Sequence, residues 1–124
     1  MTNLLSMPFW KLKSANDNKF LPMLVPMLVE GEELISTYQS FRGGMVFTNK
    51  RIIAIKIHGI SGKAFRFTSL PYSRVQTYAV KTTSFPNFAN VLHIWFAGMG
   101  KVHLKFSGNT NVAYLCRVIS ENVL

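Results

Sequence analysis

Between residues 34 and 106 the chain repeats one pattern, in which apolar runs of strand length alternate with short polar breaks. The runs occupy residues 34–41, 45–48, 52–57, 64–68 and 74–82, and a last hairpin follows around residues 98–100. Valine, isoleucine, threonine and aromatic residues favour extended strands, and the glycine, asparagine and proline of the breaks favour turns. The pattern predicts a sheet of seven short antiparallel strands.

The last hairpin also permits a prediction of register. A three-residue connection at residues 98–100 puts the large apolar side chains of both strands on one face. The predicted cross-strand pairs are Phe96–Val102, Ile94–Leu104 and Leu92–Phe106. The opposite face then carries the polar, basic and indole side chains of His93, Trp95, Lys101, His103 and Lys105.

Helical patterns flank the predicted sheet on both sides. After residue 110 the apolar residues recur at helical spacing, at Val112, Leu115, Cys116, Ile119 and Val123. Asn111 precedes them as a plausible N-cap, and this helix is expected to lay its apolar stripe on the sheet. Before the sheet, Pro26 suits the first turn of a short helix, where a missing N–H is tolerated.

Four short motifs follow one another in the chain: VEGE at 29–32, FTNKR at 47–51, GISGK at 59–63 and LPY at 70–72. In this order and spacing they resemble the small bacterial pleckstrin-homology-like (PH-like) domains, over roughly residues 24–124. The resemblance implies the PH fold, a non-catalytic role and a tendency to form ring-like homo-oligomers. The chain departs from the family pattern at residues 84–90, which lack the acids common there. The turn at 42–44 is also shorter than the basic loop that holds phosphoinositide head groups in eukaryotic PH domains.

The predicted fold class is mainly β (α+β): a seven-stranded antiparallel PH-like partly open barrel, capped by a C-terminal α-helix and preceded by a short N-terminal helical segment. Residues 1–30 are assigned to an N-terminal apolar and helical segment, and residues 31–124 to the PH-like domain.

Charge is distributed unevenly along the chain. Its formal net charge is +9, and no carboxylate side chain lies between Glu33 and Glu121, where eleven lysines and arginines lie. Such a surface attracts nucleic acid, anionic lipid or an acidic protein. The candidate contacts with such a partner are Lys50, Arg51, Lys63, Trp95 and His103. For residues 49–51 the main interpretation is an ordinary turn, and phosphate or acidic-partner contact is the alternative.

The same lack of acids argues against catalysis. Paired-carboxylate hydrolysis, Asp-oriented triads and oxygen-ligated metal sites all need acids that this interval does not supply. His58, His93 and His103 show no metal-ligand spacing, and Cys116 belongs to an apolar helical stripe. The sequence therefore predicts no enzyme activity, no cofactor and no bound metal.

Two apolar regions need a covering partner. In the strand at 52–57 both faces are apolar, which favours contact of the far face with another subunit. Near the N-terminus Leu4, Leu5, Phe9 and Trp10 are expected to dock on the domain or on another subunit. Since Lys11 and Lys13 follow them, an anchor at a membrane surface is the alternative.

Together these features predict a non-catalytic binding or scaffold module that self-assembles into a homo-oligomer larger than a dimer, with an unidentified ligand. Phe85 and Phe88, in the neutral loop at 84–90, are the candidate oligomer contacts. The alternatives are a basic nucleic-acid-binding protein, in which Trp95 stacks on bases, and a peripheral adaptor at anionic membranes. The expected location is the cytoplasm, with association at the inner membrane left open.

Overall fold

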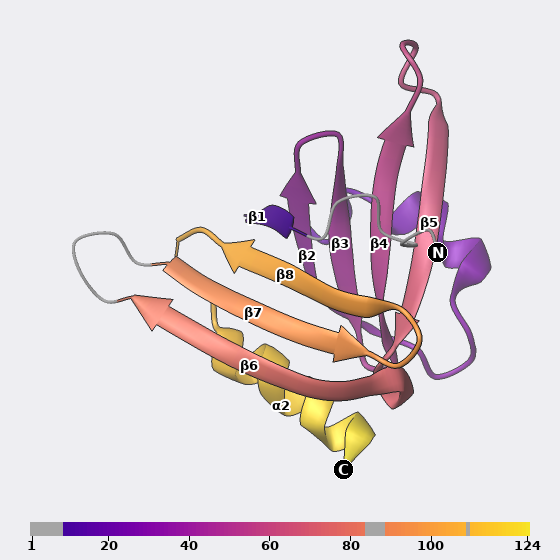
Figure 1. Ribbon diagram of the computed structural model, residues 1–124. Helices are drawn as coiled ribbons and strands as arrows, with labels where there is room; N and C mark the ends of the chain where they lie inside the picture. Colours follow the sequence, from indigo (N-terminus) through magenta and orange to yellow (C-terminus); the bar gives the residue numbers. More distant parts are fainter. Residues whose placement is uncertain (1–8, 84–88, 109) are drawn as a thin grey trace.

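In the computed structural model, which describes residues 9–83, 89–108 and 110–124, eight strands of the described chain form one curled, partly open sheet (Figure 1). Their order across the sheet is β5-β4-β3-β2-β1-β8-β7-β6. The strands are β1 (Phe9–Ala15), β2 (Leu34–Ser40), β3 (Gly43–Thr48), β4 (Arg51–His58), β5 (Ala64–Pro71), β6 (Val75–Thr83), β7 (Ala89–Phe96) and β8 (Gly100–Phe106). The helical segments are α1 (Leu21–Leu24), η1 (Val25–Met27), η2 (Tyr72–Arg74) and α2 (Val112–Val123).

The mainly β architecture with a C-terminal helix is confirmed. Strands β2 to β5 form one antiparallel meander and β6 to β8 another, and η2 connects the two. The short helical segment predicted before the sheet is present as α1 and η1. β5 continues through the predicted break as far as Pro71, which is tolerated because β5 is an edge strand.

The prediction of seven strands is one short, because the N-terminal segment contributes β1. Residues 9–12 run parallel to β8, with Phe9 opposite His103, and residues 13–15 run antiparallel to β2, with Lys13 opposite Gln39. β1 therefore joins the two meanders into one sheet. Its parallel partner is the last strand of the chain, and the local sequence pattern carries no information about such a distant pairing.

The N-terminal residues that the structure describes are packed on the domain. Trp10 and Leu12 are buried in the main core, which confirms the docking predicted for Trp10 and withdraws its indole from the surface, whereas Phe9 is 40% exposed. Leu4 and Leu5 lie outside the described residues. None of the helices in the described ranges is long and apolar enough to cross a membrane.

The hairpin of β7 and β8 has the predicted faces but a different register. Leu92 lies opposite Leu104, Ile94 opposite Val102, and Phe96 opposite Gly100. The connection is therefore residues 97–99, and each predicted pair is displaced by two positions. The apolar set still shares one face, because a displacement of two residues preserves the alternation of side chains.

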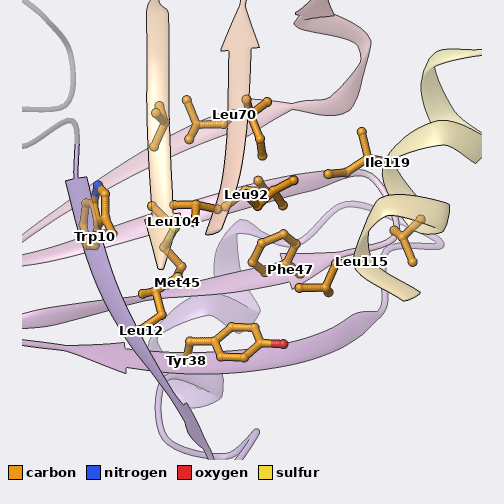
Figure 2. Close-up of a cluster of buried hydrophobic side chains, with 14 of the residues drawn as sticks. Trp10, Leu12, Tyr38, Met45, Phe47, Leu70, Leu92, Leu104, Leu115 and Ile119 are labelled. Atoms are coloured by element: carbon orange, nitrogen blue, oxygen red, sulfur yellow. The ribbon is translucent and has the colours of Figure 1, made fainter. Parts of the chain in front are cut away.

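The main core fills the concave side of the sheet, and α2 covers it (Figure 2). Val112, Leu115, Cys116 and Ile119 of α2 are buried as predicted, and the Asn111 side chain accepts a hydrogen bond from the Tyr114 N–H at 3.0 Å. The one exception to the predicted stripe is Val123, which is 38% exposed at the last turn.

The far face of the first meander is covered by the chain itself. Phe20 and Leu24 pack on Val46, Ile53 and Ile55 in a second core. This corrects the expectation that another subunit covers this part of the sheet. The approach is close, because a Cβ added to Gly44 would lie 2.6 Å from Cε2 of Phe20 and 2.4 Å from the Tyr38 carbonyl oxygen.

Candidate functional site

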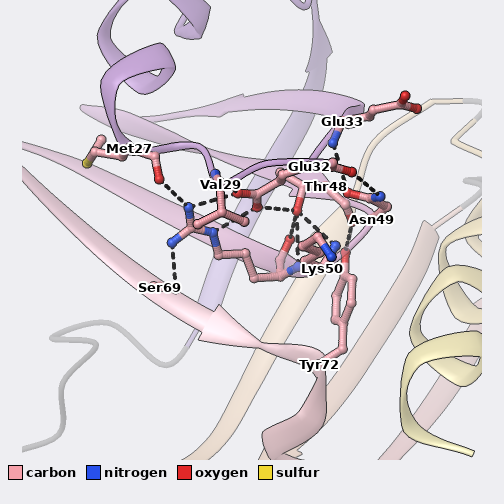
Figure 3. Close-up of polar contacts among 11 residues, drawn as sticks. Met27, Val29, Glu32, Glu33, Thr48, Asn49, Lys50, Ser69 and Tyr72 are labelled. Atoms are coloured by element: carbon pink, nitrogen blue, oxygen red, sulfur yellow. Dashed lines mark hydrogen bonds and ion pairs between the residues drawn. The ribbon is translucent and has the colours of Figure 1, made fainter.

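Arg51 of the FTNKR turn and Glu32 of VEGE form a largely buried ion pair (Figure 3). Arg51 donates from Nε to Glu32 Oε2 at 2.8 Å and from Nη2 to Glu32 Oε1 at 3.0 Å. It also donates to the Met27 carbonyl oxygen at 2.8 Å and to Ser69 Oγ at 3.1 Å. The Glu32 side chain is 0% exposed and that of Arg51 is 19% exposed. The Arg51 guanidinium is therefore directed at its own chain.

Further bonds to Glu32 and Thr48 connect three of the sequence motifs. Glu32 accepts hydrogen bonds from the Thr48 hydroxyl at 2.7 Å and from the Val29 N–H at 3.1 Å, and the Tyr72 hydroxyl donates to the Thr48 carbonyl oxygen at 2.7 Å. Burial alone would raise the pKa of Glu32, but the hydrogen bonds from Arg51, Thr48 and Val29 hold it below its ordinary value. VEGE, FTNKR and LPY thus meet in one polar network that ties η1, β3, β4 and η2 together.

Lys50 and Lys63 are exposed at opposite ends of β4. Lys50 lies in the turn before β4, and Lys63 lies in the loop after it. An eight-residue strand spans about 26 Å at ~3.3 Å per residue. The structure therefore does not bring these two lysines together in one site.

Trp95 and His103, by contrast, belong to one row of rings on the outer face of β1, β8 and β7. The ring of His103 lies 6.0 Å from that of Phe9 and 4.3 Å from that of His93, centroid to centroid, and His93 lies 6.2 Å from Trp95. The Nζ of Lys101 lies 5.2 Å from the Trp95 ring centroid. We call Phe9, His103, His93 and Trp95 the aromatic row.

The charges along the aromatic row are positive. Burial, and then the neighbouring His93 and Lys101, lower the pKa of His103, so its neutral form is favoured. Lys11 and Lys105 lie opposite each other at the border of the row and both are exposed. Such a surface suits planar groups that carry or adjoin an anion.

Sequence reasoning missed two members of this row. From the sequence, His93 shares a face with Trp95 but is not among the predicted contacts, and Phe9 belongs to a separate N-terminal segment. In the sequence, Trp10 and Leu12 alternate with Lys11 and Lys13, as in a strand with one buried face, but only the pairing of β1 with β8 brings Phe9 beside His103. Phe85 and Phe88 lie outside the described residues.

No catalytic arrangement accompanies these surfaces in the part of the chain that the structure describes. The described histidines, cysteine and acids do not come together in any group of three or more that could hold a metal ion. Cys116 is buried, and burial raises the pKa of its thiol.

Comparison with known proteins agrees with this fold. A family model for the bacterial PH domain matches residues 3–123. A crystal structure of a DUF1696 family protein with a pleckstrin-homology domain from Shewanella loihica PV-4 superposes with a TM-score of 0.76, at 27% identity, over 92% of this chain and 98% of that one. A pleckstrin homology domain from Shewanella amazonensis SB2B gives a TM-score of 0.64 at 29% identity, over 90% of this chain and 91% of that one.

A curated relative, YjqA of Bacillus subtilis (strain 168), is 35% identical over 75 residues. The match spans 60% of this chain and 60% of that relative. The family model, by contrast, covers nearly the whole chain, and the fold that it implies is the one observed. The protein belongs to the bacterial PH domain family.

Proposed function

We propose that the protein is a non-catalytic PH-like binding and scaffold module that assembles into a homo-oligomer larger than a dimer through the edges of its sheet. The observation that supports this most directly is the strand order, in which β5 and β6 stand at the two ends. Within the described chain β5 pairs only with β4, and β6 only with β7. Each edge strand therefore has one side on which its backbone can pair with another chain.

Both edge strands also carry exposed apolar side chains. Phe65 of β5 is 40% exposed and stacks on Phe67, with ring centroids 6.3 Å apart and an interplanar angle of 18°. Val80 of β6 is 43% exposed. β5 also carries Arg66 and Pro71, and β6 carries Lys81, which discourage pairing, but apolar residues of the size of Phe65 and Val80 favour burial against a partner.

The two edges of the sheet are different strands, β5 and β6, so a contact between them joins unlike surfaces of two copies. A contact of β5 with β6 of the next copy is heterologous, and repeating it gives a ring when the rotation closes. The resemblance to PH-like domains that form rings favours this arrangement over a two-fold dimer. Phe85 and Phe88 follow β6 in the sequence and remain predicted contacts. The net charge of +9 opposes assembly, and salt screens that repulsion beyond ~8–10 Å.

Light scattering coupled to size-exclusion chromatography tests the proposal. We expect the wild-type protein to exceed the mass of a dimer, and to assemble more completely at moderate salt than at very low salt. The double variant Phe65→Lys with Val80→Lys should shift the protein to monomer without unfolding it. A matched control is Phe9→Lys with Val29→Lys, since both residues are exposed, at 40% and 55%, and neither belongs to an edge strand: Phe9 lies in β1, in the middle of the sheet, and Val29 follows η1.

A wild-type protein that stays monomeric at high micromolar concentration and moderate salt would refute self-assembly. If the control variant dissociates the oligomer as fully as the edge variant does, assembly does not use the strand edges.

The aromatic row favours a second candidate function, the binding of single-stranded nucleic acid. Stacking of a base on an aromatic side chain contributes roughly 1–3 kcal/mol, and Lys11, Lys101 and Lys105 could contact the phosphates beside the rings. Titration with a labelled poly(dT) oligonucleotide tests it. Trp95→Ala should weaken binding about tenfold if a base stacks there. If wild type and Trp95→Ala bind the oligonucleotide equally, no base stacks on Trp95, and only non-specific attraction of the basic surface to the phosphates explains the binding.

A further inference from the structure

Two histidines face each other in the middle of the aromatic row. β7 and β8 run side by side (Figure 1), and His93 lies directly opposite His103 in their antiparallel register. The centroids of the two imidazole rings are 4.3 Å apart. Both side chains are half-buried on the outer face of the sheet. The two imidazoles therefore touch each other and remain open to solvent.

The neighbouring strands hold the pair in place without covering it. Phe9 of β1 lies opposite His103, and its ring stacks on that of His103 at an interplanar angle of 26°. On the other side Ala79 of β6 lies opposite His93, and Ala79 is exposed. Since alanine ends at Cβ, β6 places no large side chain beside His93 in this row. A small ion can thus approach the pair from solvent.

The imidazole nitrogens are available as ligands. Within the described chain neither His93 nor His103 takes part in a hydrogen bond. Metal ions bind the neutral form of imidazole. Burial, and then the neighbouring His93 and Lys101, lower the pKa of His103, which favours that form. His103 can therefore bind a metal ion at neutral pH without first losing a proton.

The spacing of the pair suits chelation. A metal ion binds an imidazole nitrogen at about 2.0–2.1 Å, so two imidazoles in neighbouring positions of a tetragonal complex place their ligating nitrogens about 3 Å apart. Rings whose centroids are 4.3 Å apart can reach that geometry by rotation of the side chains, without a change of the backbone. Tetragonal coordination by nitrogen is typical of Cu²⁺ and Ni²⁺.

The charges around the pair are positive and weaken the binding of any cation. The Nζ of Lys101 lies over the Trp95 ring, 5.2 Å from its centroid, and Lys11 and Lys105 are exposed at the border of the row. No acid joins the pair in the described chain, where the histidines, cysteine and acids form no group of three or more. The protein would therefore fill two positions of the metal ion, and water or an anion attracted by the lysines would fill the others.

We propose that His93 and His103 together chelate one divalent ion of a late transition metal, with Cu²⁺ bound more tightly than Ni²⁺ or Zn²⁺. The ion joins β7 to β8 on the outer face of the sheet. No metal was expected from the sequence, because the spacing of the two histidines is not that of known ligand motifs and only the pairing of the strands brings them together. The site does not depend on self-assembly, because both ligands belong to one chain.

Titration of the untagged protein with Cu²⁺, in a buffer that does not bind metal ions, tests the proposal. Trp95 reports on the ion, because its ring lies 6.2 Å from that of His93 and bound Cu²⁺ quenches the fluorescence of a nearby indole. We expect saturable quenching at one equivalent of Cu²⁺ per chain, and an electron paramagnetic resonance spectrum with two nitrogen ligands. Ni²⁺ and Zn²⁺ should compete more weakly, and Mg²⁺, which prefers oxygen ligands, should not compete.

Two substitutions remove one ligand each and keep a polar side chain on the outer face. Loss of a group that merely orients a ligand costs about 10–100-fold in metal affinity, so His93→Gln and His103→Gln should each weaken Cu²⁺ binding at least tenfold. His58→Gln is the matched control, since His58 lies at the end of β4, outside the row, and should bind like the wild type. Cu²⁺ should raise the melting temperature of the wild type and of this control, but not of the two row variants.

The variants also define the results that overturn the proposal. If either row variant binds Cu²⁺ as tightly as the wild type, one imidazole suffices and the pair does not chelate the ion. If His58→Gln weakens binding as much as the row variants do, the ion is not held at the row. A spectrum with oxygen ligands alone, or binding that persists in the double variant His93→Gln with His103→Gln, refutes the site.

Discussion

Replacing Arg51 with methionine should lower the free energy of unfolding by about 3 kcal/mol at pH 7. Removing one partner of a fully buried ion pair costs about 3–5 kcal/mol, because the other charge is left uncompensated. Here the Glu32 side chain is fully buried, but Arg51 is 19% exposed, so some water can reach the site and the lower end applies. Glu32 would keep the hydrogen bonds from Thr48 and Val29. At roughly 4 °C per kcal/mol, the melting temperature should fall by about 12 °C.

The pH dependence identifies the cause of the loss. In the wild type the folded-state pKa of Glu32 lies below the ordinary value of 4.5. The ion pair of Glu32 with Arg51 therefore stabilises the fold above pH 4.5, and this stabilisation is lost as the pH falls through the folded-state pKa. Without Arg51, burial should raise the folded-state pKa of Glu32 above its ordinary value. The variant should then gain stability relative to the wild type as the pH is lowered from 7 toward 5, because the folded state takes up the proton first.

Urea unfolding of both proteins at pH 7 and pH 5 measures this difference, with Arg66→Met, at an exposed position of β5, as the control. The control should lie within about 0.5 kcal/mol of the wild type. A deficit for Arg51→Met that is the same at both pH values would show that lost packing, and not an uncompensated Glu32 charge, explains it.

Three further predictions follow from other contacts. Gly44→Ala should destabilise the protein by about 1–3 kcal/mol, because the new methyl group would meet Phe20 and the Tyr38 carbonyl oxygen; thermal unfolding measures this. Deleting residues 1–20 should lower the melting temperature or abolish cooperative unfolding, since it removes β1 and two buried core residues, Trp10 and Leu12; an unchanged transition would contradict the role of β1. Because the folded-state pKa of His103 is lowered, its contribution to stability is present above pH 6.5 and is lost as the pH falls through the folded-state pKa; His103→Gln should reduce this dependence in pH-resolved melting curves.

Much of the fold follows from local patterns. The alternation of apolar residues predicted the strands from β2 to β8, the turn residues predicted their ends to within a few positions, and the change to helical spacing predicted α2. The two faces of the β7–β8 hairpin were also predictable, although its register was displaced by two residues. These features depend on neighbouring residues, because side-chain direction alternates along a strand whatever the strand's partner is.

The sites were less predictable, because the same residue types serve different purposes. Arg51, Lys50 and Lys63 are all basic residues at turns, but only Arg51 meets a buried acid, which is nineteen positions earlier in the chain. The five acids of the sequence are few enough to suggest such a pairing, but nothing local selects Glu32 over Glu30 or Glu33. Pairing of that kind is decided by the three-dimensional approach of η1 to β4.

The sequence by itself determined the strands, their apolar faces and the C-terminal helix, since these depend on short-range periodicity and turn chemistry. Only the tertiary structure decided the place of β1, which pairs with β8 over its first half and with β2 over its second. The pairing with β8 brings Phe9 beside His103 and so completes the aromatic row on the outer face of the sheet. The physical reason is that β1 pairs with backbone N–H and C=O groups that the rest of the fold leaves unpaired, and those groups lie far from β1 in the sequence.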